Sequence, residues 1–277
     1  PPISTLFPYT TLFRSRILDI YGNGKCEQLL GKVLKRRPDL RDQMWIQSKC
    51  GIRKDGFTYF DFSKDYILDS VDGILERLQI ERLDSLLLHR PDALMEPEEV
   101  SEAFNHLEQA GKVRHFGVSN QNPMMMELLK TAVKQPLKVN QLQLSAAFTP
   151  SFEAGFHVNM EGSKAAVRDG SVFEYCRLYD TVIQAWSVLQ HGYFKGNFVG
   201  NEEFADLNHV LNDLAKKYQV TPTAIALAWV LRYPGKMQAV IGTTKPQHVL
   251  EAGKAAEVTL TRKEWYQIYL AAGNDLP

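Results

Sequence analysis

The sequence predicts an α/β protein built as a (β/α)8 barrel of the TIM type whose first strand and helix are missing. From Arg16 onward, short apolar runs alternate with amphipathic segments, a pattern typical of parallel sheets with right-handed crossovers. Most of the apolar runs lack strict alternation, as expected where helices cover the sheet on both faces. Seven strands can be counted, and a closed barrel needs eight.

The expected strands are short and rich in aliphatic residues. They lie near residues 17–21, 44–49, 83–89, 113–118, 138–144, 181–186 and 238–241. The amphipathic segments predict helices near residues 25–37, 64–79, 97–110, 122–134, 171–179, 206–218, 222–233 and 246–256. The helix boundaries carry suitable residues: Ser63 at an N-cap, Pro97 and Pro222 in first turns, and Gly111 after a helix end.

The stretch from Ser145 to Asp180 is the least regular part of the chain. It shows little clear period until Val172 and contains three glycines, so we expect a loop over the barrel mouth that sets substrate choice. A doubly wound open sheet is the alternative fold. It is disfavoured because no Gly-x-Gly-x-x-Gly motif follows an early strand.

The amino-terminal segment looks foreign to the rest of the chain. Residues 5–15 (TLFPYTTLFRS) resemble a translated sequencing adapter, show no helical or strand period, and lack the features of a signal peptide. We therefore expect residues 1–15 to be a non-native leader and residues 16–277 to form one barrel domain.

Composition excludes several classes of function. The 277-residue chain has 32 basic and 32 acidic residues, a balance that argues against nucleic acid or an anionic membrane as an obligate partner. No apolar run is long enough to span a bilayer. The three cysteines, Cys26, Cys50 and Cys176, are widely spaced and no metal-ligand spacing occurs, so we expect reduced thiols, no metal and a cytoplasmic location.

Three polar residues follow or end successive expected strands: Tyr21, Lys49 and His89. Side chains at the carboxyl ends of parallel strands converge on one face of a barrel. A lysine ammonium near a tyrosine favours the phenolate and lowers the tyrosine pKa from its usual value of about 10, which suits general acid catalysis. A neighbouring histidine can orient a carbonyl oxygen. Taken singly, each residue could be an ordinary rim aromatic, surface charge or strand-end histidine.

The chain resembles the aldo-keto reductase family, in particular a bacterial subgroup of general oxidoreductases, from about Asp19 to Ala272. The matching motifs are Tyr21-Gly22-x-Gly24-x-Cys26-Glu27, Ser48-Lys49-Cys50-Gly51, Asp84-x-Leu86-Leu87-Leu88-His89-Arg90-Pro91-Asp92, Gly111-Lys112-Val113-Arg114-His115-Phe116-Gly117-Val118-Ser119-Asn120, Asn140-Gln141, Ala185-Trp186-Ser187 and Ile241-Gly242-Thr243-Thr244.

The resemblance implies hydride transfer from NADPH to an aldehyde or ketone, with Tyr21 as proton donor, Lys49 as modulator of its pKa and His89 as orienting donor. It also implies a set of cofactor-binding residues. Ser119, Asn120 and Gln141 would hold the carboxamide, Trp186 would stack on the nicotinamide ring, Ser187 and Leu189 would approach the pyrophosphate, and Gly242, Thr243, Thr244, Lys245 and His248 would bind the adenosine phosphate.

Two positions depart from the family pattern. The catalytic aspartate that the family places five residues before the tyrosine is Arg16 here, and Glu251-Ala252 replaces the Glu-Asn pair near the adenine. The alternatives are therefore a non-catalytic barrel that binds the nucleotide as a redox sensor or accessory subunit, and an inactive fragment. A hydrolase would need paired carboxylates at the strand ends, and the sequence offers none.

Overall fold

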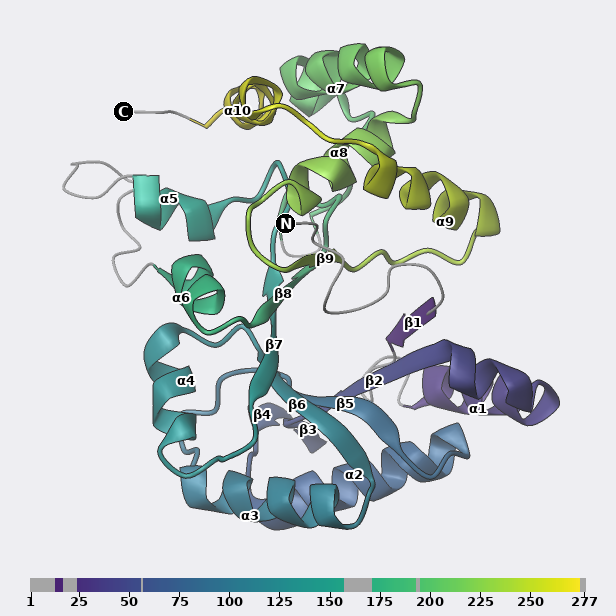
Figure 1. Ribbon diagram of the computed structural model, residues 1–277, viewed down its shortest axis with the longest axis vertical. Coiled ribbons are helices and arrows are strands. Elements are labelled where there is room, and N and C mark those ends of the chain that lie inside the picture. The colour runs from purple at the N-terminus through teal and green to yellow at the C-terminus, as the bar shows by residue number, and fades with distance from the viewer. Residues whose placement is uncertain (1–12, 17–23, 56, 157–170, 193–194, 275–277) are drawn as a thin grey trace. The chain divides into compact units, whose positions relative to one another are not determined.

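The computed structural model describes residues 13–16, 24–55, 57–156, 171–192 and 195–274 (Figure 1). The chain divides into two compact units, Pro1–Val139 and Asn140–Pro277. Each unit alternates strands with helices, as the sequence predicts. Strand β7 (Leu137–Gln143) runs across the boundary between them.

The first unit contains four neighbouring parallel strands in the order β1 (Phe13–Arg16), β2 (Met44–Cys50), β5 (Leu83–Leu88) and β6 (Val113–Ser119). Its helices are α1 (Lys25–Arg36), α2 (Lys64–Leu78), α3 (Pro97–Gln109) and α4 (Pro123–Lys130), with a 3₁₀ helix at Pro38–Gln43. Helices α2 and α3 lie along one side of β2, β5 and β6 (Figure 1). An antiparallel hairpin, β3 (Ile52–Asp55) and β4 (Phe57–Phe60), follows β2.

The second unit pairs β8 (Val182–Trp186) in parallel with β9 (Met237–Ala239). Its helices are α5 (Pro150–Phe156), α6 (Val172–Leu178), α7 (Ala205–Tyr218), α8 (Pro222–Leu231), α9 (Pro246–Gly253) and α10 (Arg262–Ala271), with 3₁₀ helices at Glu202–Phe204 and Lys254–Glu257. The core is strongly aromatic: the Trp229 and Trp265 rings stack at 4.8 Å, and each indole N–H donates to the carbonyl oxygen of the other residue.

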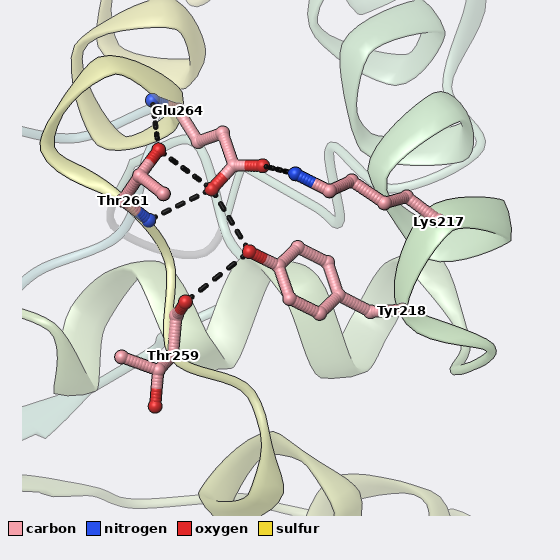
Figure 2. Close-up of polar contacts among 5 residues, drawn as sticks. All are labelled: Lys217, Tyr218, Thr259, Thr261 and Glu264. Atoms are coloured by element: carbon pink, nitrogen blue, oxygen red, sulfur yellow. Dashed lines mark hydrogen bonds and ion pairs between the residues drawn. The ribbon is translucent and has the colours of Figure 1, made fainter.

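A polar cluster fastens α10 to α7 (Figure 2). The Glu264 carboxylate accepts hydrogen bonds from the Lys217 ammonium at 2.6 Å and from the Tyr218 hydroxyl at 2.9 Å. Thr261 and Glu264 also form a reciprocal capping box at the start of α10. This arrangement satisfies backbone N–H groups that a helix start would otherwise leave without partners.

Several expectations about the elements are confirmed. Six of the expected strands correspond to β2, β5, β6, β7, β8 and β9, and Pro97, Pro222 and Pro246 each begin a helix. The strand expected at 17–21 lies outside the described residues. Ser63 occupies the N-cap of α2, but its side chain makes no capping hydrogen bond.

Other expectations were wrong. The helix expected at 122–134 ends at Lys130, and the stretch expected to be irregular after Ser145 contains α5. The segment that lacks a strand period contributes β1, because parallel pairing with β2 joins backbone groups whatever the side chains are. The hairpin β3–β4 and the helix α10 were not predicted. The charged Arg53 and Lys54 interrupt the apolar pattern by which the first hairpin strand could have been recognised. For α10, the capping-box signal Thr261-x-x-Glu264 was present in the sequence.

Candidate active site

Lys49 and His89 lie close together at the carboxyl ends of neighbouring strands in the first unit. Lys49 is the penultimate residue of β2, pairs in register with Leu87 of β5 and is 6 % exposed. His89 follows the last residue of β5, is 7 % exposed, and its backbone N–H donates to the Cys50 carbonyl oxygen at 2.9 Å. The sequence prediction that these two side chains meet at one edge of the sheet is consistent with this pairing.

His89 is held in its neutral form. Burial lowers its pKa to about 2, and the positive charges of Lys49 and Arg90 act in the same direction. Its Nδ1 atom is buried and has no hydrogen-bond partner among the described residues. A neutral imidazole in this position can donate one hydrogen bond to a ligand oxygen without bringing a second charge beside Lys49.

Ser119 and Asn120 end the next strand, β6. Val118 pairs in register with Leu88, so the residues that follow them, Ser119 and His89, come at the same level of the sheet. Ser119 is fully buried, and its hydroxyl accepts a hydrogen bond of 2.9 Å from the Asn120 amide. The backbone of Asn120 is left-handed (φ 56°), a conformation that asparagine tolerates better than most residues. The chain thus turns sharply and leaves two polar side chains at the end of β6.

A buried ion pair supports β2 directly before Lys49. The Glu27 carboxylate of α1 is fully buried and accepts hydrogen bonds from the Ser48 hydroxyl at 3.1 Å and from Arg77 Nε of α2 at 2.5 Å. At Gly24, a Cβ would lie 2.7 Å from Arg77 Cδ, and its φ of 79° also favours glycine. Glu27 therefore joins three elements at the point where the candidate site is built.

In the second unit, the residues expected at the nicotinamide lie on β7 and β8. Gln141 of β7 is 3 % exposed, and its Nε2 donates to Gln184 Oε1 of β8 at 3.2 Å. Trp186 is the last residue of β8, and Ser187 after it has a left-handed backbone (φ 52°). The Leu189 carbonyl oxygen accepts from the Phe198 N–H at 3.0 Å, which fastens this loop.

The residues expected at the adenosine phosphate gather between β9 and the start of α9. The backbone N–H of Lys245 donates to the Thr243 hydroxyl at 3.2 Å, and that hydroxyl lies 3.3 Å from His248 Nδ1. Gly242, Thr244, Lys245 and His248 are exposed, and α9 begins at Pro246 as expected. A lysine, hydroxyls and a helix start with open N–H groups suit a phosphate.

Tyr21 and Asp19 lie outside the described residues. Arg16, which stands where the family has its aspartate, is the last residue of β1, and its backbone pairs in register with Gln47. It therefore lies two residues before the level of Lys49 on the neighbouring strand.

Sequence reasoning overlooked two pairs of polar residues beside the expected ones, each with one buried member, Glu27 or Gln184. One is the pair Glu27 and Arg77, of which only Glu27 stood in a matched motif. The other is Gln184 with Gln238, whose side chains join at 3.1 Å. The available signal for Gln184 was its spacing of two from Trp186, which places both on one face of β8.

The family of the chain follows from comparison with known proteins. The model of the aldo/keto reductase family matches residues 18–271, and the chain belongs to this family. The parallel β/α alternation and the placement of Lys49 and His89 at strand ends agree with that membership.

Two curated relatives and one solved structure illustrate the similarity. Oxidoreductase YdhF of Escherichia coli K12 is 35 % identical over 94 % of this chain and 83 % of its own. The 6-dehydroglucose reductase of Agrobacterium fabrum is 32 % identical over 93 % and 82 %. An aldo-keto reductase of Klebsiella pneumoniae, crystallised in complex with NADPH, has a TM-score of 0.71 at 23 % identity, covering 93 % of this chain and 78 % of its own. The fold is thus the α/β fold of the aldo-keto reductase barrels.

Two kinds of feature, a membrane-spanning helix and a metal-binding cluster, are absent from the described residues. In the part of the chain that the structure describes, no helix has the length and apolar character needed to cross a membrane. No group of three or more His, Cys, Asp or Glu side chains among the described residues could hold a metal ion.

Proposed function

We propose that this protein is an NADP-dependent reductase that transfers a hydride from NADPH to the carbonyl carbon of an aldehyde or ketone. The single observation that carries the proposal is the pairing of buried Lys49 with the neutral, buried His89 at adjacent strand ends. Membership of the aldo/keto reductase family and the NADPH complex of the Klebsiella pneumoniae protein support it. We expect a cytoplasmic enzyme of small-molecule carbonyl compounds, with no nucleic acid or membrane partner.

The residues present suit this cofactor. Ser119 of the first unit and Gln141 of the second are each buried polar side chains at or near a strand end, and each has groups that could exchange hydrogen bonds with a carboxamide. Asn120 adds a second amide beside Ser119, and Trp186 offers an aromatic face at the end of β8. Ser187 and Leu189 would approach the pyrophosphate. Gly242, Thr243, Thr244, Lys245 and His248 would hold the adenosine phosphate, and the cation and hydroxyls favour a 2′-phosphorylated nucleotide.

Three residues act on the carbonyl oxygen of the substrate: Tyr21, Lys49 and His89. When bound, NADPH supplies the hydride, which leaves negative charge on that oxygen. Tyr21 donates a proton to the oxygen from its phenol, and the Lys49 ammonium stabilises the resulting phenolate. His89 is neutral, so its N–H holds the oxygen in place without competing with Tyr21 as an acid.

The test compares the unchanged protein with Tyr21→Phe. NADPH oxidation is followed by absorbance with an aromatic aldehyde and with 6-dehydroglucose, the sugar named for the Agrobacterium fabrum relative. Loss of the phenol proton should reduce kcat by roughly 10²-fold or more while the Kd for NADPH stays unchanged. Equal turnover by both proteins would refute the role of Tyr21, and absence of NADPH binding to a folded protein would refute the whole proposal.

A second candidate, a nucleotide-binding barrel without catalysis, is favoured by Arg16. An arginine at the position where the family has a carboxylate reverses the charge expected there. If this second candidate is correct, the unchanged protein binds NADPH with at most a residual turnover. Arg16→Asp should then raise that turnover by roughly tenfold or more. Arg16→Asn is the matched control, because it removes the positive charge without adding a negative one. Substantial turnover by the unchanged protein would eliminate this candidate.

A further inference from the structure

Three glutamine side chains form a hydrogen-bonded row across the second unit. Gln141 Nε2 on β7 donates to Gln184 Oε1 on β8 at 3.2 Å, and Gln184 Nε2 donates to Gln238 Oε1 on β9 at 3.1 Å. Gln184 and Gln238 are directly opposite in the register of the two strands. Gln184 is 2 % exposed, so water does not replace these partners. The row is therefore buried at Gln141 and Gln184 and reaches a half-buried position at Gln238.

The row has a direction. A primary amide has a donor end and an acceptor end, and Gln184 uses both. Turning the Gln184 amide over would bring its NH₂ against that of Gln141 and its oxygen against that of Gln238. Each buried group left without a partner costs about 1–3 kcal/mol, so the Gln184 amide does not turn over unless Gln141 and Gln238 turn with it. In the structure the amide nitrogen of Gln141 faces Gln184, so its oxygen is the atom that the row does not use, and Gln184 couples the orientation of Gln141 to that of Gln238.

The row also lies beside the residues expected at the nicotinamide. Gln184 comes two residues before Trp186, so both side chains are on the same face of β8, about 7 Å apart along the strand. Gln141, at the other end of the row, is itself expected to contact the carboxamide. The amide row thus connects the carboxamide residue to the strand that carries the stacking aromatic.

We propose that Gln184 is a positioning residue, which turns the amide of Gln141 so that its oxygen accepts a hydrogen bond from the carboxamide NH₂ of the bound nicotinamide. The inference rests on the proposed function, since it assumes that NADPH is the cofactor. Gln238 acts one step further away by holding the donor end of Gln184. Gln184 itself does not touch the ligand.

The experiment measures Kd by calorimetric titration with two probes, NADPH and adenosine 2′,5′-bisphosphate, which lacks the nicotinamide. Gln184→Met keeps the side-chain length but removes both hydrogen bonds. It should weaken NADPH binding about tenfold, as expected for the loss of one hydrogen bond. Binding of the bisphosphate should change by less than about twofold, because a positioning effect acts only at the nicotinamide end.

Two further variants separate positioning from general damage. Gln141→Met combined with Gln184→Met should bind NADPH no more weakly than Gln141→Met alone, because Gln184 acts only through Gln141. The matched control is Gln135→Met in the first unit, a buried glutamine whose Nε2 donates to Asn105 and Glu108; both Kd values should stay unchanged.

The outcomes are distinguishable. Equal losses for both probes in Gln184→Met, or unchanged NADPH affinity, would overturn the inference while leaving the proposed function intact. An additive loss in the double variant would also overturn it. If the unchanged protein binds the bisphosphate but shows no added affinity for NADPH, the proposed function fails and the inference fails with it.

Discussion

The protonation state of His89 is set by its surroundings. Because burial lowers its folded pKa to about 2 from an ordinary value of 6.5, the proton favours the unfolded chain. His89 therefore reduces stability progressively as the pH falls below 6.5 and has no such effect above it. In the folded protein the imidazole stays neutral across the physiological range.

We predict that the ring resonances of His89, assigned by comparison with His89→Asn, do not shift in proton NMR spectra between about pH 5 and pH 8. In denaturant the same resonances should titrate near 6.5, which provides the internal control. A folded-state titration near 6.5 would show that the imidazole is solvated and would remove the argument for a neutral donor. His89 should likewise contribute no inflection to the pH profile of kcat/KM, so any inflection seen in the unchanged protein should remain in His89→Asn.

How far single residues could be predicted depends on where they stand in a strand. Lys49 and His89 could be identified because a polar residue at the end of an apolar run marks the point where a strand leaves the sheet. Gln184 and Gln238 could not, because a polar residue inside a strand acquires meaning only from its partner on the neighbouring strand. That pairing depends on register, which one sequence does not reveal.

At the scale of elements, the Glu27 carboxylate of α1 bonds to both β2 and α2. Glu27 is fully buried, whereas its partner Arg77 is about one-third exposed, so removing the negative charge leaves an arginine that can still reach water. Glu27→Gln should lower the free energy of unfolding by about 2 kcal/mol, somewhat less than for a fully buried pair.

Urea denaturation would measure the effect of Glu27→Gln, with Glu76→Gln on the exposed face of α2 as the matched control. The control should change stability by no more than about 0.5 kcal/mol, as for most surface substitutions. Similar midpoints for the two variants would mean that the Glu27 hydrogen bonds do not contribute net stability to the attachment of α1.

The attachment of α10 to α7 depends on pH (Figure 2). Burial raises the pKa of Glu264, but hydrogen bonds from Lys217, Thr261 and Tyr218 outweigh that effect and bring the pKa to about 2 from 4.5. Since the folded pKa is depressed, Glu264 stabilises the protein above pH 4.5, and this stabilisation is lost as the pH falls to about 2. The difference corresponds to about 3 kcal/mol.

Glu264→Gln should therefore be less stable than the unchanged protein near neutral pH, and the two stability curves should converge as the pH approaches 2. Denaturant titrations at a series of pH values would measure this. Glu257→Gln is the control, because Glu257 forms an exposed ion pair with Lys254 that should contribute at most about 1 kcal/mol. Parallel curves for Glu264→Gln and the unchanged protein would contradict the assigned cause.

Two of the elements that escaped prediction, β3 and α5, lack the periodicity by which strands and helices are recognised. Regular periodicity reveals helices and strands that bury one face, but β3 carries charges and α5 has only seven residues, too few to establish a period. The helix α10 was also not predicted, although its capping box and aromatic run were present in the sequence. Local capping chemistry was thus the stronger signal at this end of the chain.

At the scale of the whole molecule, the seven-stranded sheet of the described residues ends in two edge strands. Among the described residues, β1 pairs with β2 alone and β9 with β8 alone. A closed barrel leaves no strand edges, and an unpaired edge invites association with other chains. We proposed from the sequence that residues 1–15 are a non-native leader, and the strand and helix that would complete the barrel fall at that position.

Replacing residues 1–16 with the corresponding amino-terminal segment of Escherichia coli YdhF, a relative 35 % identical to this chain, should therefore complete the barrel. We expect a higher Tm, a single cooperative transition in calorimetry and less association in light scattering, because the new segment takes the place of β1 beside β2 and supplies the strand that a closed barrel needs. The control carries the same segment with its residues in shuffled order, which preserves length and composition but not the strand and helix patterns. If the shuffled segment stabilises the protein equally, the gain comes from removing residues 1–16 and not from closing the barrel. If neither segment changes Tm or association, residues 1–16 serve the fold as they stand, and the proposal of a non-native leader fails.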